Sequence, residues 1–198
     1  GAVTNTWDFA GVNGKPGTPF WICSFDNTTH VWTKPVLLGI VGNRNDIHNG
    51  PSVCITSKGH LYVFTGGHLE RNYYVRTKTP LDLNSFTAPI PMIAKPTTNQ
   101  EKMFTYPGAV IDKYDTIYIV YRGPWYFLSL FCLYTASSDK ISYIKLFDHS
   151  RAKTYNGIAP LDNNVNYINW RHTISVDKFS NLYITILPKP NTRLWSDL

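Results

Sequence analysis

Residues 51–64 read Pro-Ser-Val-Cys-Ile-Thr-Ser-Lys-Gly-His-Leu-Tyr-Val-Phe, which is an apolar segment, a short polar segment and a second apolar segment. Two runs rich in β-branched and aromatic residues, separated by a tight turn, predict a β-hairpin. A hairpin of this length brings its two outer ends together at one edge of a sheet. This stretch decides the fold, because the same pattern returns further along the chain.

The second copy runs from Pro107 to Val120 and the third from His172 to Thr185. Laid over the first copy without gaps, they place apolar residues and a tyrosine at the same positions: Ile55, Ile111 and Val176; Tyr62, Tyr118 and Tyr183; Val63, Ile119 and Ile184. Asp112 and Asp177 also coincide. More strands are expected at 73–76 and 128–134, and an N-terminal unit at 20–32. Four short strands per repeat of roughly 40 to 65 residues are typical of a β-propeller blade.

We therefore predict an all-β protein, a β-propeller of four-stranded antiparallel blades. Residues 1–198 form one such domain or part of one, with repeat units near 20–65, 73–121 and 126–187. Three to four blades leave open sheet edges, so the chain is expected to cover part of a larger ring. The missing blades would come from the rest of the chain or from another subunit. A β-sandwich with chance self-similarity is the alternative.

The composition narrows the class of function. Hydrophobic residues make up 43% and charged residues 16%, which indicates a packed globular protein. The net charge of +6 favours an anionic partner, but Lys and Arg are scattered, so no nucleic-acid-binding arm is expected. No segment reaches the roughly 18 apolar residues of a membrane span. Cys54 and Cys132 lie in apolar strand patterns and are expected as buried thiols.

Two histidines flank the first hairpin. His48 lies in Asp-Ile-His-Asn-Gly-Pro, residues 46–51, and His68 follows two glycines. Because the outer ends of a hairpin meet, both imidazoles can reach one edge of the sheet. Imidazole is the side chain best suited to proton transfer near neutral pH. His60, in the turn at the other end of the hairpin, is expected in solvent.

The segments 32–38, 46–52 and 60–68 together resemble the BNR-4 repeat proteins, and the pattern is most similar to the ulvan lyases with a seven-bladed propeller. Those enzymes carry a His in Asp-x-His-Asn-x-Pro, a His after Gly-Gly or Ser-Gly, a Tyr in Thr-Tyr-Pro and an Arg in Tyr-Arg. The matching residues here are His48, His68, Tyr106 and Arg122. The resemblance covers roughly residues 7 to 185. It implies a secreted or periplasmic polysaccharide lyase.

The chemistry of β-elimination from a uronate polysaccharide fits these side chains. A cation must neutralise the carboxylate, a base must remove the proton at C5, and an acid must protonate the departing glycosidic oxygen. The planar fork of Arg122 matches a carboxylate. A neutral His48 or His68 can accept the proton. Tyr106, a weak acid, can donate to the leaving oxygen or act as the base for one sugar epimer.

The expected substrate is an acidic, ulvan-like polysaccharide, and the scheme requires no cofactor. Some proteins of this group hold structural metal ions, but no cluster here has clear ligand spacing, so no metal site is predicted. Several residues near the predicted catalytic ones are candidates for substrate contact: Arg44, Asn49, Trp125, Tyr126, Arg171 and His172.

Two other functions stay open. A non-catalytic carbohydrate-binding or assembly propeller would keep the scaffold alone. A sialidase-like glycoside hydrolase would carry Asp boxes of the form Ser-x-Asp-x-Gly-x-Thr-Trp, and the nearest string, at residues 137–142, breaks that pattern. Retaining glycosidases also use a close pair of acids. Few acids fall in the candidate loops, namely Asp46, Glu70 and Glu101.

Overall fold

The computed structural model describes residues 17–41, 50–65, 72–92, 105–122, 128–134, 140–147, 167–168, 173–185 and 188–189. Within these ranges the secondary structure is β-strand without helix, as the strand-like periodicity predicted. The strands are β1 Thr18–Ile22, β2 Phe25–Asp26, β3 Val31–Trp32, β4 Val36–Val41, β5 Ser52–Ile55, β6 Leu61–Phe64, β7 Tyr73–Arg76, β8 Ile90–Pro91, β9 Thr105–Ile111, β10 Thr116–Arg122, β11 Leu128–Tyr134, β12 Lys140–Phe147, β13 Tyr167–Ile168, β14 Thr173–Val176, β15 Leu182–Thr185 and β16 Pro188–Lys189.

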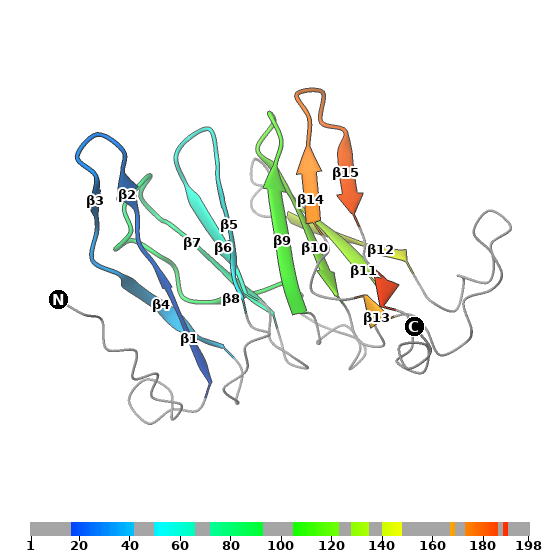
Figure 1. The fold of residues 1–198 in the computed structure, drawn as a ribbon, viewed down its shortest axis with the longest axis horizontal. Helices are drawn as coiled ribbons and strands as arrows, with labels where there is room; N and C mark the ends of the chain where they lie inside the picture. The colour runs from blue at the N-terminus through cyan, green and yellow to red at the C-terminus, as the bar shows by residue number, and fades with distance from the viewer. Residues whose placement is uncertain are drawn as a thin grey trace, which may run out of the picture.

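Two sheets have four strands each, and each is built from consecutive antiparallel strands, β5 to β8 and β9 to β12. The predicted strands at 73–76 and 128–134 are confirmed, each as the third strand of its sheet. The other strands pair two by two, as β1–β4, β2–β3, β14–β15 and β13–β16. Figure 1 shows the sheets side by side along the long axis of the molecule. The described strands do not close into a ring.

The three repeat copies fold into equivalent hairpins. Their registers pair Ile55 with Leu61 in the first copy, and the corresponding residues pair in the hairpins β9–β10 and β14–β15. In each turn the equivalent residue has a left-handed φ, 82° at Gly59, 62° at Asp115 and 68° at Ser180. A tight turn followed by one left-handed residue is a common hairpin connection. The repeat seen in the sequence is therefore a repeated hairpin.

The aligned aspartates hold these turns together. Asp112 Oδ1 accepts the backbone N–H groups of Tyr114 and Thr116, each at 2.9 Å. Its Oδ2 accepts the hydroxyl of Tyr118 at 3.2 Å, so the aligned tyrosine and aspartate form one unit. Asp177 makes the equivalent bonds in the third hairpin. Such side-chain bonds to the backbone are a standard way for Asp to stabilise a turn.

The core lies between the sheets, which pack face to face. On β10, Ile119 and Tyr121 face the sheet β5–β8, whereas Val120 faces the hairpin β14–β15. On β6, Phe64 faces the sheet β9–β12, whereas Val63 packs with residues of β1 and β4. Both four-stranded sheets are therefore apolar on both faces. This is expected where each sheet packs face to face against a neighbouring sheet on either side.

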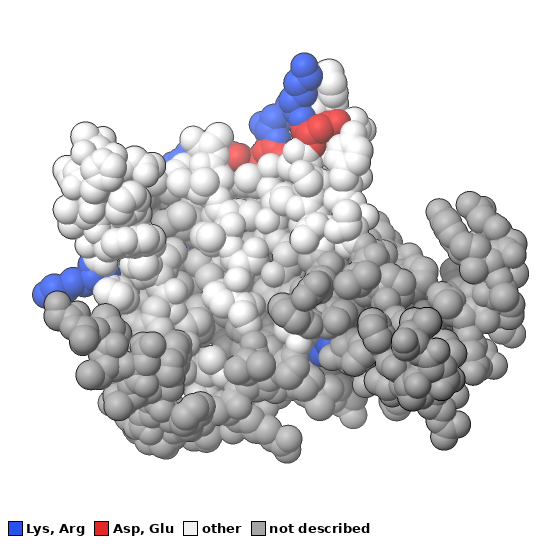
Figure 2. All heavy atoms as spheres, viewed as in Figure 1, with Lys and Arg blue, Asp and Glu red and all other residues white. Residues whose placement is uncertain are grey.

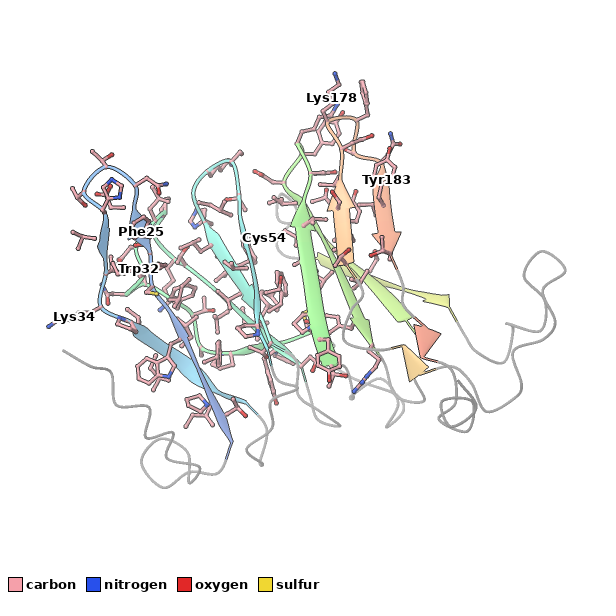
Figure 3. All side chains as sticks on the ribbon, viewed as in Figure 1. Phe25, Trp32, Lys34, Cys54, Lys178 and Tyr183 are labelled. Atoms are coloured by element: carbon pink, nitrogen blue, oxygen red, sulfur yellow. The ribbon has the colours of Figure 1, made fainter. Side chains whose placement is uncertain are left out.

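Smaller predictions from the sequence had mixed outcomes. Cys54 is buried, as predicted, and its side chain can be followed in Figure 3. The side chain of Cys132, on β11, lies outside what the structure describes. The expectation that His60 lies in solvent is wrong, because it is partly buried and its Nδ1 lies 3.0 Å from the carbonyl oxygen of Thr77. In the described part of the chain there is no helix of the length and hydropathy that crossing a membrane requires.

Candidate functional site

Tyr106 and Arg122, two of the four predicted catalytic residues, lie in contact at one end of a sheet. β9 begins at Thr105 and β10 ends at Arg122, and the two strands are antiparallel, so these ends meet. Arg122 Cζ lies 4.6 Å from the centroid of the Tyr106 ring. This distance is within the range of an attractive cation–π interaction. The structure therefore brings together a guanidinium and a phenol that are 16 positions apart in the sequence.

A β-bulge shapes this contact. The ladder pairs Val120 with Gly108 and Arg122 with Thr105, so two residues of β9 lie opposite a single residue of β10. Tyr106, the first of those two, has a φ of 55°. A left-handed conformation costs an L-residue about 1 to 2 kcal/mol, and the surrounding structure must hold it. Bulges and residues in such conformations recur next to active sites, where they redirect a side chain.

Arg122 is buried, with 3% of its surface exposed. Its Nε donates a hydrogen bond to the Thr105 hydroxyl at 3.0 Å. The same hydroxyl donates to the Arg122 carbonyl oxygen at 3.4 Å. Hydrogen bonds of this kind reduce the large cost of burying a charge. Thr105 was not among the residues singled out from the sequence, although it is the first residue of the Thr-Tyr-Pro motif that identified Tyr106.

The neighbouring sheet ends at the same place. The Ala109 N–H donates to Ser52 Oγ at 3.1 Å, which joins β9 to the start of β5. The Tyr121 hydroxyl donates to the Thr65 carbonyl oxygen at 3.5 Å, which joins β10 to the end of β6. Tyr121 is fully buried, and burial raises its pKa, so its phenol stays protonated and acts as a donor. The starts of β5 and β9 and the ends of β6 and β10 thus form one edge, here called the site edge (Figure 1).

His48 and His68 lie outside the described residues, as do the predicted substrate contacts Arg44, Asn49, Trp125, Tyr126, Arg171 and His172. In the sequence His48 precedes β5, which starts at the site edge, and His68 follows β6, which ends there. Short segments therefore connect both histidines to the edge that carries Tyr106 and Arg122. Within the described part of the chain, no group of three or more His, Cys, Asp or Glu is arranged to hold a metal ion.

The opposite edge, which carries the hairpin turns, has charged side chains of both signs. Figure 2 shows Lys or Arg and Asp or Glu side by side at the top of the view, over the turns of β9–β10 and β14–β15. Lys113 Nζ lies 4.9 Å from the centroid of the Tyr114 ring, and Lys178 Nζ lies 5.0 Å from that of Phe179. Since positive and negative groups alternate there, the turns do not form a surface that favours a polyanion.

One exposed aromatic pair lies elsewhere. Phe25 and Trp32 face each other across the hairpin β2–β3, with ring centroids 5.0 Å apart (Figure 3). They are 39% and 63% exposed. Their hairpin continues the two-stranded sheet β1–β4, and Tyr106 and Arg122 belong to β9 and β10, so the pair is separate from the site edge.

Among solved structures, the chain is similar to an ulvan lyase described as a new family of polysaccharide lyase, PL25. The TM-score is 0.62 and the identity 18%, over 84% of this chain and 39% of that chain. A second such structure, bound to -[GlcA(1-4)Rha3S]-, gives a TM-score of 0.61 and 17% identity, over the same 84% and 39%. At this identity the likeness is one of fold. The chain spans about two fifths of the length of these structures.

None of the curated proteins matches this chain. The family described as BNR repeat-containing matches residues 22–156, which is more than half of the chain and includes all four predicted catalytic residues. The resemblance to BNR-4 repeat proteins close to the ulvan lyases is thereby confirmed. The chain belongs to the BNR repeat-containing family, BNR_4.

Proposed function

We propose that this protein is a polysaccharide lyase that cleaves an acidic, uronate-containing polysaccharide by β-elimination. The observation that carries the proposal is the contact between the Arg122 guanidinium and the Tyr106 ring at the bulge of the site edge. The fold likeness to lyase structures supports it, as does the net charge of +6. One of those structures is bound to a fragment that contains GlcA, and an ulvan-like polymer is accordingly the first substrate to test.

The proposed roles follow from the chemistry of the side chains. Arg122 neutralises the uronate carboxylate, which makes the proton at C5 easier to remove. His48 or His68 accepts that proton as a neutral imidazole. Tyr106 gives a proton to the leaving oxygen, and the cation beside its ring stabilises the phenolate that remains. Arg44, Asn49, Trp125, Tyr126, Arg171 and His172 are proposed to contact the sugar chain.

The burial of Arg122 places a condition on this scheme. With 3% of its surface exposed, the side chain offers little area to an entering ligand. The carboxylate must contact that small exposed part or displace a neighbour of the guanidinium. A buried cation attracts an anion more strongly than an exposed one, because the surrounding dielectric constant is lower. The carboxylate must also lose its water to reach this cation, so the contact is favourable only where the attraction exceeds that desolvation cost.

The scaffold proposed for this function is part of a β-propeller. Two four-stranded antiparallel sheets, stacked face to face with further hairpins on both sides, are what neighbouring blades would form. We propose that the chain covers three to four blades of a seven-bladed ring, completed by more of the same chain or by another subunit. A polymeric substrate of this kind lies outside the cell membrane, so we place the activity in a secreted or periplasmic protein.

The test is to incubate the protein with ulvan and with other uronate polymers and to follow ultraviolet absorbance. Elimination creates a conjugated C4=C5 double bond that absorbs, whereas hydrolysis and binding do not. Removing a general acid should lower the rate about 100-fold or more, so Tyr106→Phe should be nearly inactive. Arg122→Lys replaces the planar fork that matches a carboxylate with a point charge, and it should also lose most of the activity. Tyr118→Phe is the matched control, because it removes a hydroxyl from the turn edge of the same sheet.

Each outcome separates the alternatives. Binding of the polymer without cleavage would indicate a non-catalytic carbohydrate-binding or assembly propeller. New reducing ends without the double bond would indicate a glycoside hydrolase. Full activity in both Tyr106→Phe and Arg122→Lys, beside an active wild type, would leave the reaction intact and remove these two residues from it.

A further inference from the structure

We infer that Thr105 is a positioning residue, whose hydroxyl fixes the Arg122 guanidinium beside Tyr106 in the orientation that carboxylate binding requires. This inference rests on the proposed function, because it assigns a purpose to a contact within the same site. Thr105 and Arg122 are directly opposite each other in the ladder of β9 and β10. Both are 3% exposed, so their hydrogen bonds are sheltered from water.

The geometry of the hydrogen bonds explains how the hydroxyl can act. Thr105 Oγ1 accepts from Arg122 Nε at 3.0 Å and donates to the Arg122 carbonyl oxygen at 3.4 Å. One hydroxyl thus joins the side chain and the backbone of the same residue. The guanidinium is planar, so fixing Nε also fixes the direction of the two terminal nitrogens that form a fork to a carboxylate.

The bulge gives the same residue a second influence. Thr105 is the first residue of β9 and directly precedes Tyr106, whose φ is 55°. A conformation of this kind persists only where neighbouring contacts over-determine it. The bonds of Thr105 to Arg122 lie on one side of the bulge, and the pair Gly108 with Val120 lies on the other. Loss of the hydroxyl should loosen the position of both the phenol and the guanidinium.

A buried threonine that bonds to the backbone is often purely structural, and the chain contains a matched example. Thr77 is fully buried, and its hydroxyl accepts the Leu61 N–H at 2.9 Å. Leu61 begins β6 at the turn edge, away from the site edge. Thr77→Val and Thr105→Val therefore make the same chemical change, removing a buried hydroxyl from a β-structure, but only the second lies beside Arg122.

The experiment compares Thr105→Val, Thr105→Ser and Thr77→Val with the wild type. Thr105→Val should lower kcat/KM for the uronate polymer at least tenfold, Thr105→Ser should stay within threefold because it keeps the hydroxyl, and Thr77→Val should stay within twofold. The second measurement is the ¹⁵N NMR signal of the Arg122 Nε–H, assigned by its absence in Arg122→Lys. We expect Thr105→Val to shift this signal and to speed its exchange with solvent at least tenfold.

Two results would overturn the inference. One is an unchanged Arg122 Nε–H signal in Thr105→Val. The other is equal loss of activity in Thr105→Ser and Thr105→Val, which would assign the effect to packing and not to the hydroxyl. If the wild type eliminates no uronate polymer, the proposed function fails, and the NMR measurement still decides whether Thr105 holds Arg122. The two failures are therefore distinguishable.

Discussion

Asp115 links two neighbouring sheets at their turns, and we expect Asp115→Gly to destabilise the protein. Its Oδ1 accepts the Ser57 N–H at 2.7 Å and its Oδ2 accepts the Ser57 hydroxyl at 2.6 Å, so the turn of β9–β10 is joined to that of β5–β6. Asp115 also has a left-handed φ of 62°. Ser180 occupies the same turn position in β14–β15, with a φ of 68°, and its buried hydroxyl has no hydrogen-bond partner among the described residues.

The magnitudes decide the direction of each change. Glycine relieves about 1 to 2 kcal/mol of left-handed strain but loses about 0.5 to 1 kcal/mol in the entropy of the unfolded chain. The net gain from the backbone alone is therefore about 0.5 to 1 kcal/mol. Each of the two bonds to the Asp115 carboxylate contributes about 1.5 kcal/mol. Asp115→Gly should thus cost about 2 kcal/mol, whereas Ser180→Gly should stabilise by about 0.5 kcal/mol or slightly more.

The assay is urea unfolding followed by tryptophan fluorescence and by circular dichroism, because coincidence of the two curves tests the two-state assumption. Ser57→Ala removes one of the two bonds and should cost about 1.5 kcal/mol. The double variant Ser57→Ala with Asp115→Gly should cost little more than Asp115→Gly alone, because both changes remove the same contact.

The reasoning would be refuted by glycine variants at Asp115 and Ser180 that change stability in the same direction and by the same amount. In that case the backbone conformation would account for the whole effect. The two hydrogen bonds between the turns would contribute nothing. Strict additivity of Ser57→Ala and Asp115→Gly would lead to the same conclusion.

Three further outcomes are expected. Hydrogen bonds from Asn181, first from its side chain and then from its backbone, hold the pKa of Asp177 below 3.8. The contribution of the Asp177 carboxylate to stability is therefore complete above about pH 4 and is lost as the pH falls through the lowered pKa. Asp177→Asn should accordingly flatten the acid side of a plot of Tm against pH. Burial raises the pKa of the Cys54 thiol to about 12. In a Cys132→Ser background at pH 8, a disulfide reagent should therefore react with exposed Cys23 in a fast phase that Cys23→Ser removes and Cys54→Ser retains. Ile119 is fully buried between two sheets, so Ile119→Ala should lower the free energy of unfolding by about 2 to 5 kcal/mol in urea, and a change below about 1 kcal/mol would contradict the stacking.

The hairpins could be predicted from the sequence because their causes are local. Each copy of the repeat contains alternating apolar residues and a polar turn, and the second and third copies also contain an Asp with a Tyr six residues after it. The order in which the sheets stack was harder to predict from the sequence. Residues such as Val63 and Phe64 are both buried, on opposite faces of β6, and a pattern that is apolar on both faces does not say which sheet covers which face.

Two residues of the candidate site could be named from the sequence, but their geometry could not. Tyr106 and Arg122 were named from short motifs, and the structure brings them together. The bulge between them depends on the register of two strands, which the sequence does not specify. The sequence around Tyr106 also does not predict a φ of 55° for a tyrosine. The sequence does not distinguish Thr105 as a site residue, because threonine is common in β-strands. Its proposed role follows only from the hydroxyl that contacts Arg122.

The copies of the repeat differ along the site edge, where the proposed site lies. At the turn edge the copies agree, since Tyr62, Tyr118 and Tyr183 coincide. At the site edge they diverge, and the position of Tyr106 in the second copy is taken by Gly50 in the first. A Cβ added at Gly50 would meet nothing within 4 Å, so the equivalent place in the first hairpin is open. Residues that fold the hairpin are similar from copy to copy, whereas the proposed site needs one phenol and one guanidinium. Divergence of the copies along one edge is therefore what a repeat protein with one asymmetric site requires.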